Sequence, residues 1–518
     1  MKKYLIRSGK LPTDNLATSE YLERNVLGSN SGNFLYLHGI IRTLMLDEGV
    51  TFESTQYKMI FTKDEIDRFN RECDGYIIPL ADAFRMDFVP ELIHQTKLIK
   101  KLKMPVWLIG VGVSRESLDI IRREGELAVQ KRAYRAGQLA EPPEGKIILR
   151  TAVKKFINAI LKKGTIIGIR GADTAEFLSE LGYVEGEHFR IIGCPSMYTF
   201  GNHLSIRDTE KGRDCPVAFN LSQSPKGRKF LFNAQKEFDD AIYVGQVMAE
   251  LQTLYWGTDF RTYNTGEPWN LKDMTFPSTL DHPFYKEDRV RFFVNVHEWL
   301  EFMRTRDFVF GTRLHGNITA VIAGTPSLMI VKDKRMRELA EFHGLCYIKD
   351  NHIKDYKNIH EMIADVDFHK PEAKQEENFR NFLDFLHVNG LETIYDNDFD
   401  RVDAPLDKAI EQAGVSNPIT SAVKCSQREL AERIIPSVDM FRDRHKDQIR
   451  AIRRRDIELK HLYDVLDCRP VKMTIGVRNA LLPEKRRIKV RNLFEREAAI
   501  ALKNELAEAE LEKALEEQ

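Results

Sequence analysis

Residues 307–326 read DFVFGTRLHGNITAVIAGTP, and this stretch decides the fold class. Phe308–Gly311 is a short apolar run that predicts a buried strand, and the spacing after it predicts a helix starting near Asn317. The polar residues Thr312–Gly316 connect the two at the carboxyl end of the strand. A strand that leads directly into a helix is the repeating unit of α/β proteins with parallel sheets.

The same alternation extends over the first 400 residues. Further strands are predicted at Val106–Val113, Thr165–Ile169, Val217–Leu221 and Ser327–Val331, with a helix at Asp173–Leu181. Residues 200–215 are polar and rich in turn formers, and a new strand follows them. We therefore predict two Rossmann-like domains, 1–205 and 206–400, that face a central cleft. Ligands of such sheets bind beyond the carboxyl ends of the strands.

Two stretches differ from this pattern. Residues 114–163 are charged and helical in character, interrupted by Glu141–Gly145, and are predicted to be a helical insertion in the first domain. Residues 401–518 have no strand pattern and are predicted to form a charged helical tail, chiefly over 427–466 and 490–518. The basic run 485–491 within it favours a solvated helical face over a membrane or nucleic-acid contact. Self-association through this tail is a further hypothesis.

Composition narrows the class of protein. The 518 residues contain 78 Lys plus Arg and 78 Asp plus Glu, so no overall field attracts nucleic acid. Six cysteines lack a CxxC spacing, which indicates reduced thiols and no metal site. The N-terminus has no long apolar segment, and no apolar run approaches the ~20 residues that span a bilayer. We therefore expect a cytoplasmic protein without a transmembrane segment.

The turn after Gly311 carries the strongest chemical pattern. Arg313 offers a planar fork for phosphate or carboxylate, and His315 is a side chain suited to proton transfer near neutral pH. Gly316 and Asn317 stand at the predicted helix N-terminus, where unpaired backbone N–H groups favour an anion. The alternative is a structural arginine paired with a neighbouring acid and a core histidine bonded to the backbone.

A second strand-to-helix turn repeats this logic at Arg170 and Gly171. Gly171 allows a close backbone turn, and Asp173 or Thr174 is predicted to cap the following helix. The alternative is a local ion pair of Arg170 with Asp173 or Glu176. Two strand–arginine–helix turns, one in each domain, would suit a doubly anionic ligand held between the domains. We therefore predict that both turns bind such a ligand.

A third segment, Asn30–Asn33, is a glycine-containing turn before a helix-like stretch. We predict that Gly32 and Asn33 belong to a substrate-binding loop, although an ordinary βα turn gives the same pattern.

These segments together resemble the polysaccharide pyruvyl transferase family. The resemblance rests on IRGADTAEFLSELG (169–182), GCPS (193–196), GTRLHGNITAVIAGTP (311–326), NSGNFL (30–35), VWLIGVGV (106–113) and Lys334, and it runs from about Asn30 to Leu345. It implies two Rossmann-like halves in the GT-B arrangement, phosphoenolpyruvate as donor, and a ketal-linked pyruvate on a sugar. It also implies that Arg170 and Arg313 bind the phosphate and carboxylate of the donor, and that His315 is the general acid or base.

The acceptor side departs from the family pattern. Residues 77–84 read IIPLADAF where many members have a glycine-rich strand end. Asp82 is our candidate acceptor-binding residue there, with Asp87 as a further candidate, although both suit ordinary loop carboxylates. No metal is expected, because no metal-ligand spacing appears and the implied chemistry needs none. No cofactor is expected either, since phosphoenolpyruvate would be a co-substrate.

Two other functions remain open from the sequence. A nucleotide-sugar glycosyltransferase of the GT-B type would need an acidic residue for ribose, and Glu298 or Glu301 is a candidate. A non-catalytic binding or scaffold protein on the same fold would fit the altered strand end and the charged tail.

Overall fold

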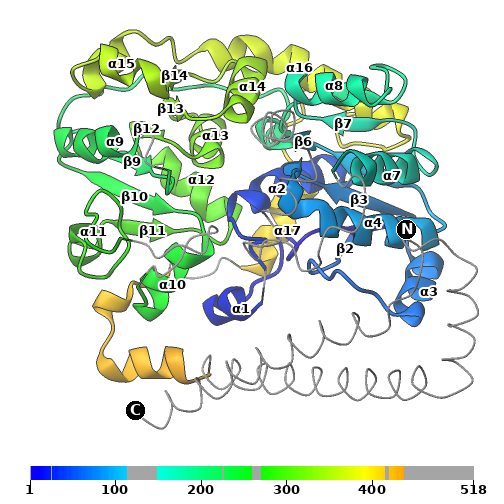
Figure 1. Cartoon of the computed structure of the whole chain (residues 1–518), viewed down its shortest axis with the longest axis horizontal. Coiled ribbons are helices and arrows are strands. Elements are labelled where there is room, and N and C mark those ends of the chain that lie inside the picture. The colour runs from blue at the N-terminus through cyan, green and yellow to red at the C-terminus, as the bar shows by residue number, and fades with distance from the viewer. Residues whose placement is uncertain are drawn as a thin grey trace, which may run out of the picture. The chain divides into compact units, whose positions relative to one another are not determined.

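The computed structural model describes residues 2–24, 26–113, 149–224, 227–259, 270–414 and 419–436. The chain divides into two compact units, Met1–Ile434 and Ile435–Gln518. The sheets, the helices labelled in Figure 1 and both pockets described below belong to the first unit.

A parallel sheet occupies the first half of this unit, in the order β2-β1-β3-β5. Gly110 N donates to Gly168 O at 2.9 Å just after β5, so the pair β7–β8 continues the same edge. The chain reverses direction across the sheet between β1 and β3, which makes this the topological switch point. The strands are β1 (Lys2–Ile6), β2 (Val50–Ser54), β3 (Gly75–Pro79), β4 (Asp82–Phe84), β5 (Val106–Ile109), β6 (Gly112–Val113), β7 (Ile167–Ile169) and β8 (Phe189–Ile191).

A second parallel sheet occupies the other half, in the order β11-β10-β9-β12-β13-β14. This is the 3-2-1-4-5-6 order of Rossmann folds, with its switch point between β9 and β12. The strands are β9 (Val217–Asn220), β10 (Ala241–Gly245), β11 (Val290–Phe292), β12 (Phe308–Gly311), β13 (Ser327–Val331) and β14 (Tyr347–Lys349). The four central strands β10, β9, β12 and β13 are almost wholly buried, as parallel sheets covered on both faces require, whereas the edge strand β14 is partly exposed.

Helices cover both sheets and connect successive strands (Figure 1). They are α1 (Thr18–Glu23), α2 (Gly32–Leu44), α3 (Lys63–Glu72), α4 (Val89–Lys101), α7 (Leu149–Leu161), α8 (Ala172–Glu180), α9 (Arg228–Ala234), α10 (Met248–Trp256), α11 (Pro283–Lys286), α12 (Val296–Arg304), α13 (Leu314–Ile322), α14 (Lys334–His343), α15 (Ile359–Ala364), α16 (Lys370–Val388) and α17 (Pro405–Ala413). Short 3-10 turns lie at η1 (Met86–Phe88), η2 (Pro195–Tyr198), η3 (Gln235–Glu237), η4 (Asp350–Asp355) and η5 (Ala422–Lys424).

Helix α2 lies between the two halves and is buried over nearly its whole length. Its apolar side chains belong to the hydrophobic cluster that also contains the second sheet, and it packs against α12 and α13. One core therefore joins the halves. The predicted fold class, α/β with two Rossmann-like halves beside a cleft in the GT-B arrangement, is confirmed.

Helix α13 begins earlier than its sequence pattern predicts. It starts at Leu314 rather than near Asn317, because the Arg313 carbonyl already accepts from Asn317 N at 3.3 Å and from Asn317 Nδ2 at 2.7 Å. Asn317 is therefore one turn inside the helix, and His315 lies in the first turn.

The predicted strand Val106–Val113 is also wrong in detail, because it is broken into β5 and β6. Gly110 separates them with φ of 80°, a left-handed conformation that glycine adopts without strain. The break turns the Gly110 carbonyl toward the end of β7, where Arg170 binds it.

Some predictions fall partly outside the described residues. In the insertion predicted at 114–163, residues 149–161 form helix α7, and 114–148 lie outside. In the tail, α17 and residues 427–436 are helical, and 437–518 lie outside. The division into 1–205, 206–400 and 401–518 stays a prediction. Within the ranges that the structure describes, no helix is both long and apolar enough to cross a bilayer.

Candidate functional site

A large cleft of about 730 Å³ lies where the two halves meet. The first half contributes residues after β1 and β3, and the second half contributes residues after β9, β10, β12 and β13. Both topological switch points therefore open onto one cavity, the place where α/β sheets bind ligands. This volume lies within the few hundred to 1,000 Å³ of typical small-molecule pockets.

Arg170 follows β7 and lines this cleft, although only 1% of the residue is exposed. Its Nε donates to Gly110 O at 2.6 Å, while Nη2 has no hydrogen-bond partner among the described residues. The guanidinium lies 5.8 Å from the centre of the Tyr36 ring. Arg170 is thus a buried cation whose Nε is bonded to the Gly110 carbonyl and whose Nη2 can donate to a ligand.

Arg313 follows β12 and lines the same cleft, but its fork is already engaged. Nε donates to Leu221 O at 2.6 Å, and Nη2 forms an ion pair of 3.0 Å with Glu250 Oε1. Glu250 is buried, and its other oxygen accepts from Gln246 N at 2.7 Å and Val247 N at 2.9 Å. In this structure the Arg313 guanidinium therefore forms an ion pair with an acid, as the structural alternative from the sequence predicts.

His315 is half-buried in the first turn of α13 and also lines the cleft. Its Nε2 lies 3.9 Å from Cys194 Sγ, which in turn lies 3.3 Å from Ser196 Oγ. The imidazole and the Tyr36 ring are 6.0 Å apart, so Tyr36 is a neighbour of both His315 and Arg170. The chain thereby brings a cation and an imidazole from different halves to one aromatic ring.

Gly32 packs against His315 from the first half. A Cβ atom at Gly32 would lie 2.6 Å from His315 Nδ1, closer than any side chain permits. Gly32 is not among the residues that line the cleft, so it makes room for the imidazole behind the site.

The predicted anion site at Gly171 is occupied by a side chain from the second half. Glu338 Oε1 accepts from Thr174 N at 3.2 Å, and a Cβ at Gly171 would lie 2.2 Å from Glu338 Cγ. The predicted cap by Asp173 or Thr174 is wrong, because neither side chain caps α8 and Thr174 Oγ1 instead accepts from Val113 N. Burial raises the pKa of Glu338 to about 7.

Gly316 and Asn317 serve packing in the described structure. Asn317 is 3% exposed. Its Nδ2 donates to Arg313 O, and its Oδ1 accepts from Ser327 Oγ at 2.8 Å. A Cβ at Gly316 would lie 2.6 Å from Gln246 Nε2 and 2.7 Å from Asn220 Nδ2. Neither residue lines the cleft.

Of the acceptor candidates, Asn33 and Asp82 line the cleft. Asn33 Nδ2 donates to the carbonyls of Leu27 and Gly28, and its Oδ1 accepts from Tyr36 OH at 3.1 Å. Asp87 does not line the cleft and instead pairs with Arg85 at 2.8 Å.

Sequence reasoning missed an aromatic wall on the first half of the cleft. Arg7, just after β1, pairs with Glu91 at 3.1 Å and lies over the rings of Tyr57 (4.8 Å) and Phe88 (5.6 Å). Gln56 and Tyr57 have φ of 52° and 50°, values that are rare for a bulky residue and collect at functional sites. The strand-end rule used for Arg170 would have found Arg7.

Residues 30–333 match the sequence model of a family described as "Polysaccharide pyruvyl transferase". This match covers more than half of the chain. The chain belongs to the polysaccharide pyruvyl transferase family. No curated protein shows a significant match.

Solved structures similar to this polysaccharide pyruvyl transferase family member are distant. One is a UDP-N-acetylglucosamine 2-epimerase, with 12% identity, a TM-score of 0.37, and coverage of 75% of this chain and 97% of that one. The Methanocaldococcus jannaschii UDP-GlcNAc 2-epimerase with UDP-GlcNAc and UDP has 10% identity, a TM-score of 0.38, and coverage of 75% and 100%. The wall teichoic acid polymerase TagF has 10% identity, a TM-score of 0.30, and coverage of 79% and 89%.

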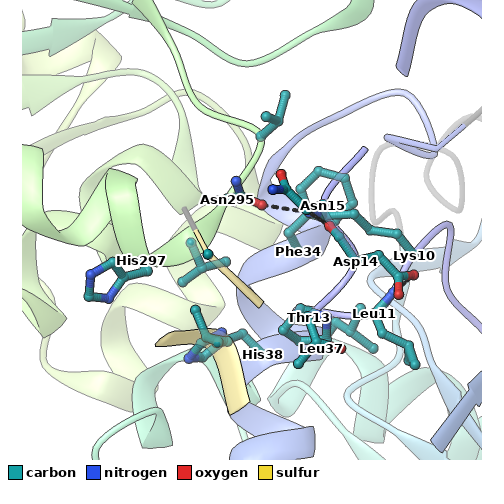
Figure 2. A pocket seen from close by; sticks show the side chains of 15 residues that line it. Lys10, Leu11, Thr13, Asp14, Asn15, Phe34, Leu37, His38, Asn295 and His297 are labelled. Carbon is teal, nitrogen blue, oxygen red and sulfur yellow. Dashed lines mark hydrogen bonds between the residues drawn. The ribbon is translucent and has the colours of Figure 1, made fainter. Parts of the chain in front are cut away.

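This family member has a second, much smaller pocket, of about 20 Å³, lined in part by Phe34, Leu37 and His38 of α2 (Figure 2). Lys10 Nζ there donates to Asn295 Oδ1 at 2.6 Å and to Asp14 O at 3.0 Å, and burial lowers the pKa of Lys10 to about 8. Nearby, burial raises the pKa of Glu298 to about 6. None of the family-motif candidates lines this pocket, so the large cleft is the better candidate site.

Proposed function

We propose that the protein transfers a pyruvyl group from phosphoenolpyruvate to a sugar of a polysaccharide or its precursor and forms a ketal. One observation carries this proposal: the buried Arg170 guanidinium and the His315 imidazole, from different halves, line one cleft. The family supports a transferase that modifies polysaccharides.

The reaction needs a bound donor that carries a phosphate and a carboxylate, and one proton transfer to carbon. Protonation of the methylene carbon makes C2 electrophilic, and a sugar hydroxyl adds its oxygen there and loses its proton. The C2–O bond to phosphate then breaks, and a second hydroxyl closes the ketal as its proton is released. His315 is proposed to give or take a proton during these reaction steps. The expectation that no cofactor or metal takes part stays a prediction.

The donor anion is proposed to lie against Arg170, whose unpartnered Nη2 supplies a charge-assisted hydrogen bond. Arg313 contributes a positive charge that Glu250 partly offsets and holds in place. The aromatic wall of Tyr36, Tyr57 and Phe88 supports a sugar acceptor on the first half, since aromatic faces offer large apolar contact area.

Phosphate release from phosphoenolpyruvate with galactose-, glucose- and mannose-type acceptors tests the proposal. We expect His315→Ala to abolish release and Arg170→Lys or Arg313→Lys to weaken donor binding at least tenfold, because a point charge cannot replace a planar fork. His352→Ala, an exposed histidine on η4, is the control and should keep the wild-type rate. An unchanged rate in His315→Ala would remove that residue from the mechanism.

The glycosyltransferase alternative depended on Glu298 or Glu301, and neither lines the cleft. Glu301 pairs with Arg304 on the exposed side of α12. A thermal melt separates the functions: phosphoenolpyruvate should raise the Tm and a nucleotide sugar should not. A melt that responds to neither would favour the scaffold alternative.

A further inference from the structure

Two neutral side chains in the second half of the cleft have buried donors that no described residue satisfies. Ser222 and Gln246 line the cleft and are 6% and 1% exposed. Ser222 Oγ and Gln246 Nε2 have no hydrogen-bond partner among the described residues. An unsatisfied buried donor destabilises the folded protein, so each such group calls for an explanation.

The topology explains why these two residues are neighbours. Ser222 follows β9 and Gln246 follows β10, and these strands are adjacent in the sheet. Ser222 N donates to Thr312 Oγ1 at 2.7 Å, which ties the end of β9 to the end of β12 across the switch point. The donors therefore stand where a Rossmann-type sheet binds its ligand.

The surrounding structure fixes Gln246 in place. Its backbone N–H donates to the same Glu250 carboxylate that holds Arg313. Gly316, in the first turn of α13, leaves the space that the Gln246 amide occupies, because a Cβ there would lie 2.6 Å from Nε2. The Gln246 side chain is thus fixed in place, although its Nε2 donates to no described residue.

Arg170 Nη2 is the third buried donor without a partner among the described residues that line the cleft. All three groups donate, and they come from both halves. A ligand that satisfies them must present several oxygen acceptors, and an oxyanion does so most strongly because its hydrogen bonds are charge-assisted.

We propose that Ser222 and Gln246 bind an oxyanion group of the donor, its phosphate or carboxylate, from the second half, while Arg170 binds the donor from the first half. This inference rests on the proposed function, and it gives the second half neutral ligands in addition to Arg313. It also accounts for Arg313 being held in an ion pair: other residues supply the unengaged donors.

Binding of phosphoenolpyruvate and of orthophosphate by titration calorimetry tests the inference. Gln246→Leu keeps a similar volume and removes the donor, and Ser222→Ala removes the hydroxyl. We expect each substitution to weaken the binding of phosphoenolpyruvate by at least about tenfold, since hydrogen bonds to charged groups contribute about 1.5–3 kcal/mol. Gln246→Glu should weaken the binding of both phosphoenolpyruvate and orthophosphate further, because the new carboxylate repels an oxyanion. Gln252→Glu places the same charge on α10, elsewhere on the cleft wall, and should change affinity by about twofold at most.

The outcomes separate the two proposals. If wild type binds phosphoenolpyruvate and the three Ser222 and Gln246 variants bind it equally well, the inference is overturned and the proposed activity stands. If wild type binds orthophosphate through Gln246 but not phosphoenolpyruvate, the oxyanion site stands and the proposed donor is wrong. Equal losses in Gln252→Glu and Gln246→Glu would show a general charge effect and overturn the inference. Circular dichroism of each variant checks that it is folded.

Discussion

Glu338 brings a carboxyl from the second half to the N-terminus of α8 in the first half. Its ordinary pKa is 4.5, and burial raises it to about 7 in the folded protein. Between these values the folded chain binds a proton that the unfolded chain has lost. Stability therefore falls as pH rises from 4.5 to 7, and the full cost remains above pH 7.

Glu338→Gln removes this titration and keeps an oxygen that accepts from Thr174 N. We expect the variant to gain stability relative to wild type as pH is raised from 5 to 8, by about 3 kcal/mol at most. Thermal unfolding at both pH values measures this. Glu341→Gln, an exposed acid on the same helix, should follow wild type. Parallel profiles for the two variants would contradict the assignment.

Residue identities predicted part of the site. Arg170, Arg313 and His315 all line the cleft, as the strand-end argument requires. Their partners could not be predicted: Glu250 is 63 residues from Arg313, and Glu338 is 164 residues from Thr174. Local sequence shows which residues end a strand, whereas the acid that meets them depends on tertiary packing. The roles assigned to these residues stay predictions.

At the scale of elements, the strand and helix patterns were the most informative. Phe308–Gly311 and Ser327–Val331 are strands with the predicted bounds, because uninterrupted apolar runs suit a fully buried parallel sheet. The break at Gly110 was missed because it is tied to another segment through Arg170. The early start of α13 was missed because the Asn317 side chain bonds the Arg313 carbonyl, a local contact that apolar spacing does not reveal. These two details decide where Arg170 and His315 stand.

Helix α16 connects the second half back to the first (Figure 1). Gln375, 3% exposed, donates from Nε2 to Met197 O at 2.9 Å and to Gly201 O at 2.7 Å. Gln375→Leu leaves both carbonyls without this donor, so we expect a loss of about 1–3 kcal/mol and a lower Tm. Glu376→Gln changes an exposed neighbour and should leave the Tm within error. Equal melting temperatures for Gln375→Leu and wild type would contradict the role of Gln375.

At the scale of the whole molecule, Arg42 shows where the first unit can be shortened. It is 1% exposed and bonds Asp407 through Nε (3.0 Å) and Nη2 (2.7 Å), and Nη2 also donates to Val402 O at 2.6 Å. Truncation after residue 400 removes these partners and leaves a buried cation without them. Truncation after residue 434 keeps them and follows the boundary between the two units.

We expect truncation after residue 434 to preserve the Tm and donor binding, and truncation after residue 400 to destabilise the protein by about 2 kcal/mol or more. Size-exclusion chromatography of the same variants tests the tail. If residues 435–518 mediate self-association, the full chain forms oligomers and the 434-residue variant is a monomer. Identical monomeric elution would end that hypothesis, and equal melting temperatures for the two truncations would contradict the role of Asp407.

The double connection between the halves has a mechanical consequence. The backbone crosses once between η2 and β9 and returns through α16, after which Asn389 Oδ1 accepts from Thr165 N and Ile166 N at 3.3 Å, and its carbonyl accepts from Trp107 Nε1 at 3.1 Å. Two covalent connections, together with the core that joins the halves around α2, restrain both twisting and separation of the halves. Substrates and products would then pass through the open side of the cleft, while the strand ends of the two halves keep their spacing from one turnover to the next.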